Sequence, residues 1–130
     1  MKKLYKTGDK KQYAFTVEAQ DVARFHGETV HEVCSTFVLA REVEWSTRLF
    51  VLDMTESDEE GVGTMLEIKH KSPAFVGETV HIEAEVERFE NNELICNYAA
   101  MVQDRLVAVG QTGQKILKKD KIKEIFSTFK

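Results

Sequence analysis

The sequence has few of the residues that stabilise small proteins without a large core. Its 130 residues include only two cysteines, Cys34 and Cys96, and one proline, Pro73. Two cysteines that lie so far apart in the sequence make neither a disulfide framework nor a zinc knuckle. We therefore expect reduced thiols, no metal, and a single domain over residues 1–130 with a core large enough to hold it together.

Long apolar runs are also missing. No run approaches the roughly 18 residues that a membrane-spanning helix needs. The lysine-rich start has no apolar segment of the kind found in a signal peptide. From these two absences we expect a cytoplasmic protein without a membrane partner.

Basic residues are scarce in the central part of the chain. Residues 1–11 and 115–130 contain eleven lysines and three acidic residues, whereas residues 12–114 contain 7 basic and 19 acidic residues and carry a net charge of -12. An acidic body argues against nucleic acid as a partner. The basic terminal segments, about 1–11 and 118–130, are either solvated tails or a binding site for an anionic ligand.

One long segment, residues 34–52, contains neither glycine nor proline. The pair Ser35-Thr36 is placed to cap a helix, with Thr36 as the expected N-cap. Apolar residues occupy two opposite sides of the helical wheel, with Leu39, Ala40, Val43, Thr47, Phe50 and Val51 on one side and Val38, Trp45, Leu49 and Leu52 on the other. A helix that is apolar nearly all round is buried on more than one side, so we expect a sheet and a second subunit to cover it.

Most of the remaining segments alternate apolar and polar residues as strands do. Strands are predicted at residues 11–19, 61–71, 80–87, 94–102 and 106–117, with a connection at 21–31 and a short amphipathic helix within 118–130. One helix cannot cover a flat sheet of this size. We therefore expect an α+β fold in which an antiparallel sheet of five to six strands wraps around one long central helix. Apolar residues on both faces of the segment 94–117 predict a homodimer.

Glu44 and His70 are the two polar residues that are the strongest candidates for acid–base chemistry. Glu44 either forms surface ion pairs with Arg48 and Arg41, or is buried and then needs a partner or a proton. The apolar character of the helix favours burial. Alternation in residues 61–71 places His70 on the same face as Val62, towards the helix. There it is either a hydrogen-bonded core histidine or a general base.

Two residues at the start of the helix have a structural and a chemical interpretation. Thr36 is either only a cap, or a hydroxyl beside the free helix N–H groups, which favour a developing oxyanion. The eight residues from Thr36 to Glu44 span about 12 Å of helix, so a site that uses both needs a dimer interface or a relay through His70. Cys34 is a weaker alternative as nucleophile, because no neighbour in the sequence looks like its base.

Several short motifs follow one another in an order and spacing typical of one family. Ser35-Thr36, Glu44, Val62-Gly63-Thr64, His70, Ser72-Pro73-Ala74 and Val76-Gly77 resemble the hotdog-fold thioesterases of the fluoroacetyl-CoA thioesterase type, and the likeness extends from about Tyr13 to Lys115. The resemblance implies a hotdog fold, a homodimer or dimer of dimers with active sites at the interface, and hydrolysis of an acyl-CoA thioester.

The resemblance also implies roles for individual residues. Thr36, Glu44 and His70 would form the catalytic set, and the backbone of Gly63 would contact the acyl group. Thr64, Phe37 and Ala40 would complete the substrate-binding residues. Phe37 stands where the family usually has proline, and residues 27–35 contain no aromatic gate. We therefore do not carry the selectivity for fluoroacetyl-CoA over to this chain.

The sequence thus predicts an acyl-CoA thioesterase for a small acyl group. Glu44 and His70 would activate water or form a transient acyl-enzyme, while Thr36 and backbone N–H groups steady the carbonyl. No cofactor is required beyond the CoA thioester itself, and Lys69, Lys71 or the basic C-terminal segment would contact its phosphates. Two alternatives stay open: a non-catalytic acyl-CoA-binding module that acts as a sensor or carrier, and an enoyl-CoA hydratase or dehydratase.

Overall fold

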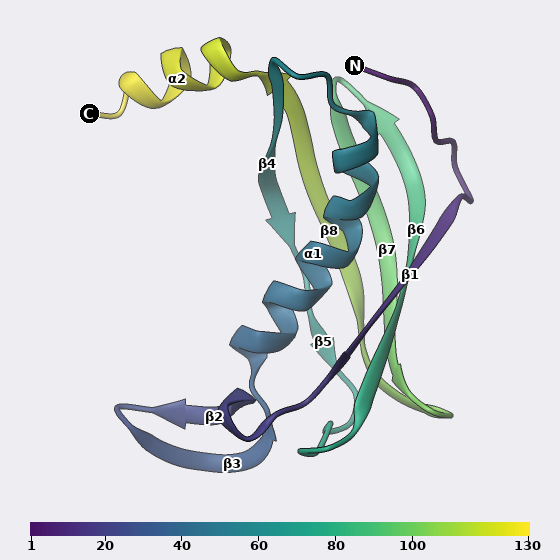
Figure 1. The fold of residues 1–130 in the computed structure, drawn as a ribbon, viewed down its shortest axis with the longest axis vertical. Coiled ribbons are helices and arrows are strands. Elements are labelled where there is room, and N and C mark those ends of the chain that lie inside the picture. Colours follow the sequence, from purple (N-terminus) through teal and green to yellow (C-terminus); the bar gives the residue numbers. More distant parts are fainter.

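A curled antiparallel sheet packs against one long helix in the computed structural model, which describes residues 1–130 (Figure 1). The strand order in the sheet is β1, β6, β7, β8, β4, and a short strand β5 also pairs with β8. The α+β hotdog prediction is confirmed. The strands are β1 (Lys10–Thr16), β4 (Glu59–Leu66), β5 (Lys69–His70), β6 (Thr79–Glu90), β7 (Glu93–Val102) and β8 (Arg105–Lys118).

The central helix α1 spans Thr36–Met54 and packs against all five main strands. The side that faces the sheet is buried and includes Val43, Phe50 and Val51. The opposite side is only partly covered in this chain: Val38 is buried and Leu49 half-buried, but Trp45 is 41% and Leu52 47% exposed. The expectation that the helix is buried on more than one side is therefore not met within a single protomer.

The predicted strands follow the alternation in the sequence closely. In β6 every second residue from Val80 to Val86 is buried against α1, while the residues between them face outwards. The β6–β7 hairpin turns at Asn91 and Asn92, whose φ angles are 54° and 64°. Positive φ at both central residues is the geometry of a type I′ turn, which asparagine tolerates well.

Residues 21–31, expected to be a connection, contain most of a hairpin. A short 3-10 helix (Ala19–Asp21) leads into β2 (Val22–Phe25) and β3 (Glu28–Cys34), which pair with each other and lie outside the main sheet. Phe25 is 67% and Val30 50% exposed. Because this hairpin is exposed on both faces except at the end where Val22 and Cys34 pair, its sequence lacks the alternation by which strands are recognised.

The predicted strand 61–71 is interrupted between β4 and β5. At this point the backbone of Glu67 crosses close over β8, and a Cβ added to Gly110 would lie 2.0 Å from the Glu67 carbonyl oxygen. The same oxygen accepts a hydrogen bond of 2.7 Å from the hydroxyl of Tyr98, which is almost fully buried. The absence of a side chain at Gly110 is what allows this close approach of the two backbones.

The basic N-terminal segment packs against the core, whereas the basic C-terminal segment extends away from it. At the N-terminus, the ring of Tyr5 packs edge-on against Phe50 with centroids 4.9 Å apart. The C-terminal helix α2 (Lys119–Ser127), which the sequence predicts, extends from β8 away from the sheet (Figure 1). No helix in the structure is both long enough and apolar enough to cross a membrane.

Candidate active site

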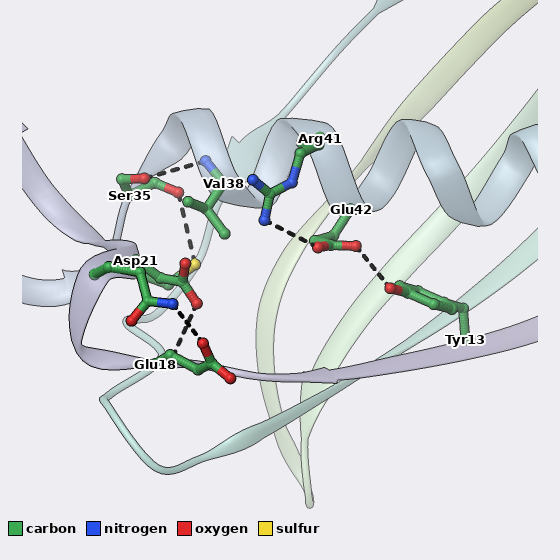
Figure 2. A network of polar contacts seen from close by, with 9 residues as sticks. Tyr13, Glu18, Asp21, Ser35, Val38, Arg41 and Glu42 are labelled. Carbon is green, nitrogen blue, oxygen red and sulfur yellow. Dashed lines mark hydrogen bonds and ion pairs between the residues drawn. The ribbon is translucent and has the colours of Figure 1, made fainter.

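Thr36 and His70 meet at the N-terminal end of α1. Thr36 is the first residue of the helix, and its Oγ1 lies 3.1 Å from Nε2 of His70. The helix is capped by Ser35, whose hydroxyl accepts a hydrogen bond of 3.1 Å from the backbone N–H of Val38 (Figure 2). The prediction that Thr36 is the N-cap is therefore wrong. Since Ser35 is the cap, the Thr36 hydroxyl is available to pair with His70.

Pairing with β8 holds His70 in this position. His70 is opposite Ala108 in the β5–β8 ladder, and the backbone N–H of Lys71 donates to the Val107 carbonyl at 2.8 Å. The imidazole is exposed, as is Thr36. The sequence therefore predicted correctly that His70 lies on the helix side, but it is a solvent-accessible group at the helix end and not a core histidine.

Glu44 has neither of the two environments that the sequence suggests. Its side chain is exposed in this chain. Arg48 donates instead to the Gly61 carbonyl at 3.3 Å and to Glu60 at 3.1 Å. Arg41 pairs with Glu42 at 3.1 Å (Figure 2). Glu44 is thus neither buried nor paired with Arg41 or Arg48 within the protomer, and its carboxylate has no cationic partner.

The Glu44 carboxylate lies against Gly63 of β4. A Cβ added to Gly63 would be 3.2 Å from Oε1 of Glu44 and would meet no other residue within 4 Å. Gly63 therefore faces the helix, whereas uninterrupted alternation through 61–71 would place it on the opposite face. The pairing of Gly63 with Gln114 and of Met65 with Gly113 leaves Thr64 as the extra residue of a β-bulge, which shifts the alternation.

Thr64 lies on the other face of the sheet. Its hydroxyl donates to the carboxylate of Glu93, at the start of β7 and on the side away from α1. Thr64 is therefore separated from the Glu44 carboxylate by the sheet within one protomer. The bulge is the reason, because it divides the predicted strand face between the two sides.

A groove of about 740 Å³ runs along the exposed side of α1. It brings Glu44 together with Phe37 and Ala40, two of the predicted substrate-binding residues. Phe37 is 76% exposed, so its ring is free to contact a ligand or another chain. The groove is lined by Tyr13, Phe37, Ala40, Arg41, Glu42, Glu44, Trp45 and Arg48.

Cys34 does not have the environment of an activated nucleophile. Burial, with a smaller contribution from the nearby Asp21 carboxylate, raises the pKa of the Cys34 thiol to about 11. The helix N-terminus, which could favour a thiolate, does not offset this burial. The thiol is therefore protonated near neutral pH.

Unpaired cations are few in the acidic body of the protein. Of the seven basic residues between positions 12 and 114, four form ion pairs with carboxylates, namely Arg41, Arg48, Arg88 and Arg105. The other three, Arg24, Lys69 and Lys71, have no carboxylate partner. Lys69 and Lys71 flank His70, and Arg24 belongs to the hairpin that leads into α1. The free cations of the body are therefore on segments that adjoin the Thr36–His70 pair.

A comparison with known protein families identifies the family of this chain. A model of a protein family described as fluoroacetyl-CoA-specific thioesterase, FlK, matches residues 17–120. The chain belongs to this family. No curated protein sequence matches it.

Solved structures with the same fold include members and relatives of the FlK family. A hypothetical protein of Thermus thermophilus, described as a thioesterase superfamily member, is 28% identical, with a TM-score of 0.88 over 95% of this chain and 92% of that one. The fluoroacetyl-CoA thioesterase FlK is 18% identical, with a TM-score of 0.86 over 95% and 96%. A hot-dog-like protein of Thermanaerovibrio acidaminovorans is 20% identical, with a TM-score of 0.87 over 98% and 95%. At such identities the last two show a shared fold.

One residue of this FlK-family chain near the site, Gln114, and one free cation, Arg24, were missed in the sequence. Gln114 lies opposite Gly63 on the helix side of β8, is 1% exposed, and donates to Thr47 Oγ1 at 3.0 Å. A glutamine at a position of β8 that alternation places on the buried face was the signal that could have revealed Gln114. Arg24 could have been found from the scarcity of cations in the body.

Proposed function

We propose that this FlK-family protein hydrolyses a small acyl-CoA thioester to a free acid and CoA. The observation that carries the proposal is the arrangement along α1: a Thr36–His70 hydrogen bond at the helix start and an unpaired Glu44 carboxylate against Gly63. Family membership supports the same chemistry. Mutants of FlK have been solved with fluoroacetate and CoA, and with acetyl-CoA.

Each of these groups has a role that its position allows. Glu44 carries no competing ion pair, so its carboxylate is available to take a proton from water or to attack the thioester carbonyl. Gly63 offers backbone without a side chain, which lets the acyl group approach Glu44. Thr36 and His70, beside the free N–H groups of the first helical turn, would stabilise negative charge on the carbonyl oxygen.

A second copy of the chain would bring these groups together. Within one protomer, Thr36 and Glu44 are eight residues apart on the helix, or about 12 Å. Strand β4 is one edge of the sheet, and its last two residues, Met65 and Leu66, are exposed apolar residues. An unpaired edge next to apolar surface is suited to antiparallel pairing with the same edge of another copy. We therefore propose a homodimer, with a dimer of dimers as the next level.

The phosphates of CoA need cations that are not already neutralised. Lys69 and Lys71 meet this requirement, because both are exposed and neither forms an ion pair. Their position on either side of His70 would direct the nucleotide end of CoA outwards from the Thr36–His70 pair.

A panel of acyl-CoAs of increasing chain length, with free thiol as the readout, tests the proposed function. Glu44→Gln and His70→Ala are expected to lower kcat/KM by at least about hundredfold, because each removes a group in contact with the reacting atoms. Glu83→Gln and His81→Ala, on the outer face of β6, are matched controls that should retain activity.

Three outcomes would contradict the thioesterase proposal. Thiol release from no acyl-CoA, together with saturable binding in calorimetry, would indicate a sensor or carrier. Loss of an enoyl-CoA substrate without thiol release would indicate a hydratase. Full activity in both Glu44→Gln and His70→Ala would exclude the proposed catalytic residues.

A further inference from the structure

Helix α2 presents an apolar face with nothing packed against most of it. Phe126 is 51% and Phe129 84% exposed, while Ile122 and Ile125 on the same face are half-buried. A helix of this length is marginal in water on its own and is normally stabilised by packing of its apolar face. The exposed aromatic residues therefore indicate a partner surface.

The same helix carries cations that are free to bind an anion. Residues 118–130 contain five lysines and two acidic residues. Lys118 pairs with Asp58 at 2.7 Å and Lys121 with Glu124 at 3.8 Å. Lys119 and Lys123 form no ion pair. The surface that α2 offers thus combines exposed aromatic rings with unneutralised positive charge.

The position of α2 relative to the edge strand limits which surface it can reach. Glu59, the first residue of β4, pairs with Lys118, and the backbone N–H of Lys119 donates to the Asp58 carbonyl at 2.8 Å. Helix α2 therefore begins at the N-terminal end of β4 and extends beyond that edge (Figure 1). Strand β5, with Lys69, follows the C-terminal end of β4.

Antiparallel pairing of two β4 edges places the start of each strand beside the end of the other. Helix α2 of one copy then lies beside β5 of the other. On the basis of the proposed function, we propose that α2 docks on a second copy of this chain and completes its CoA phosphate site, with Lys119 and Lys123 facing Lys69 and Lys71 of that copy.

Both the long-range attraction between copies and the close-range repulsion between lysines agree with this arrangement. The body of each copy carries -12 between residues 12 and 114, which attracts the basic α2 of another copy. At close range, four lysines from two chains repel one another unless an anion lies among them. CoA supplies a pyrophosphate and a ribose phosphate, which match such a cluster. Phe126 and Phe129 would pack near Phe37, which is exposed at the start of α1.

Calorimetry with CoA and with pantetheine, which lacks the phosphates, tests the site without requiring turnover. Lys119→Glu/Lys123→Glu is expected to weaken CoA binding at least tenfold and to leave pantetheine binding unchanged. Lys2→Glu/Lys3→Glu, which makes the same charge change at the other basic end, is the matched control and should bind CoA like the unmodified protein. An equal effect of both variants, or equal weakening of CoA and pantetheine, would overturn the proposal.

A mixed dimer tests whether α2 acts on the other copy. One protomer carries Lys119→Glu/Lys123→Glu and the other Lys69→Glu/Lys71→Glu, with different affinity tags for purification. If α2 serves the second copy, one of the two sites contains only unmodified lysines, so one high-affinity CoA site per dimer is expected. If α2 serves its own chain, no high-affinity site remains.

Sedimentation and thiol release complete the test. A monomer that binds CoA with full affinity would exclude docking on a second copy. Because CoA binding is measured without hydrolysis, failure of the unmodified protein to release thiol would contradict the proposed function alone. Loss of the one-site result in the mixed dimer, with thiol release intact, would contradict the role of α2 alone.

Discussion

Replacing Gly63 with alanine is expected to reduce activity while leaving the fold intact. The added Cβ would lie 3.2 Å from Oε1 and 4.0 Å from Cδ of Glu44. It would meet no other residue within 4 Å. Glu44 is exposed and its carboxylate can move by the few tenths of an ångström required. Alanine is favoured over glycine in a strand by about 0.5–1 kcal/mol, so the free energy of unfolding should stay the same or rise slightly.

The effect on activity is larger because the methyl group occupies the approach to Glu44. A displacement of about 1 Å in a catalytic group costs on the order of 100-fold in rate. A smaller shift of Glu44, combined with the methyl group beside the acyl group, is expected to lower kcat/KM about tenfold to hundredfold. This corresponds to about 1.4–2.7 kcal/mol of transition-state stabilisation. Steady-state thiol release with the best acyl-CoA from the panel measures it.

Gly61→Ala is the matched control on the same strand. Its Cβ would lie 2.6 Å from Cγ1 of Val51, which is fully buried in the core. Overpacking of this kind typically costs about 1–3 kcal/mol. Urea unfolding should therefore separate the two variants, with Gly61→Ala destabilised and Gly63→Ala not. Full activity in Gly63→Ala, or a loss of stability as large as that in Gly61→Ala, would refute the assigned position of Glu44.

Three further predictions concern stability and reactivity. Gly110→Ala should cost about 3 kcal/mol or more in urea unfolding, because its Cβ would meet the Glu67 backbone oxygen at 2.0 Å. Cys34 should react with iodoacetamide at neutral pH more than tenfold slower in the folded than in the unfolded protein, since burial raises its pKa to about 11; fast alkylation would contradict this. The backbone N–H of Phe75 and the Arg105 guanidinium lower the pKa of Glu78 in the folded protein. Ionised Glu78 therefore adds to the free energy of unfolding above its pKa in the unfolded chain, and this stabilisation is lost as the pH falls through its pKa in the folded protein. Urea unfolding should therefore show Glu78→Gln less stable than the unmodified protein at neutral pH, with a smaller difference at about pH 3.

The order of elements could be predicted because their periodicity is local. Residues of β6 that alternate between buried and exposed reproduce the pattern in the sequence, and α1 differs from its expected bounds by two residues at each end. The hairpin formed by β2 and β3 could not be found in this way. Most of its residues are exposed on both faces, so apolar and polar residues are not sorted between them.

The geometry of the candidate site could not be predicted from the sequence. Thr36 and His70 are 34 positions apart, and their contact depends on pairing between β5 and β8. The position of Gly63 beside Glu44 depends on a bulge at Thr64, which moves one residue out of the ladder and reverses the faces of those around it. Bulges of this kind leave little trace in a single sequence.

By itself, the sequence determined the helix, the strands of the main sheet and the segregation of charge. These properties follow from local periodicity and from composition. Only the tertiary structure decided that Ser35 rather than Thr36 caps α1, that Glu44 has no ion pair, and that α2 begins at the edge of the sheet. The contacts of Arg48 with β4 and the position of α2 depend on which strands pair and in which register, and register is set by contacts between segments far apart in the chain. Ser35 and Thr36 are both good capping residues by type, so the backbone conformation at the start of the helix decides between them.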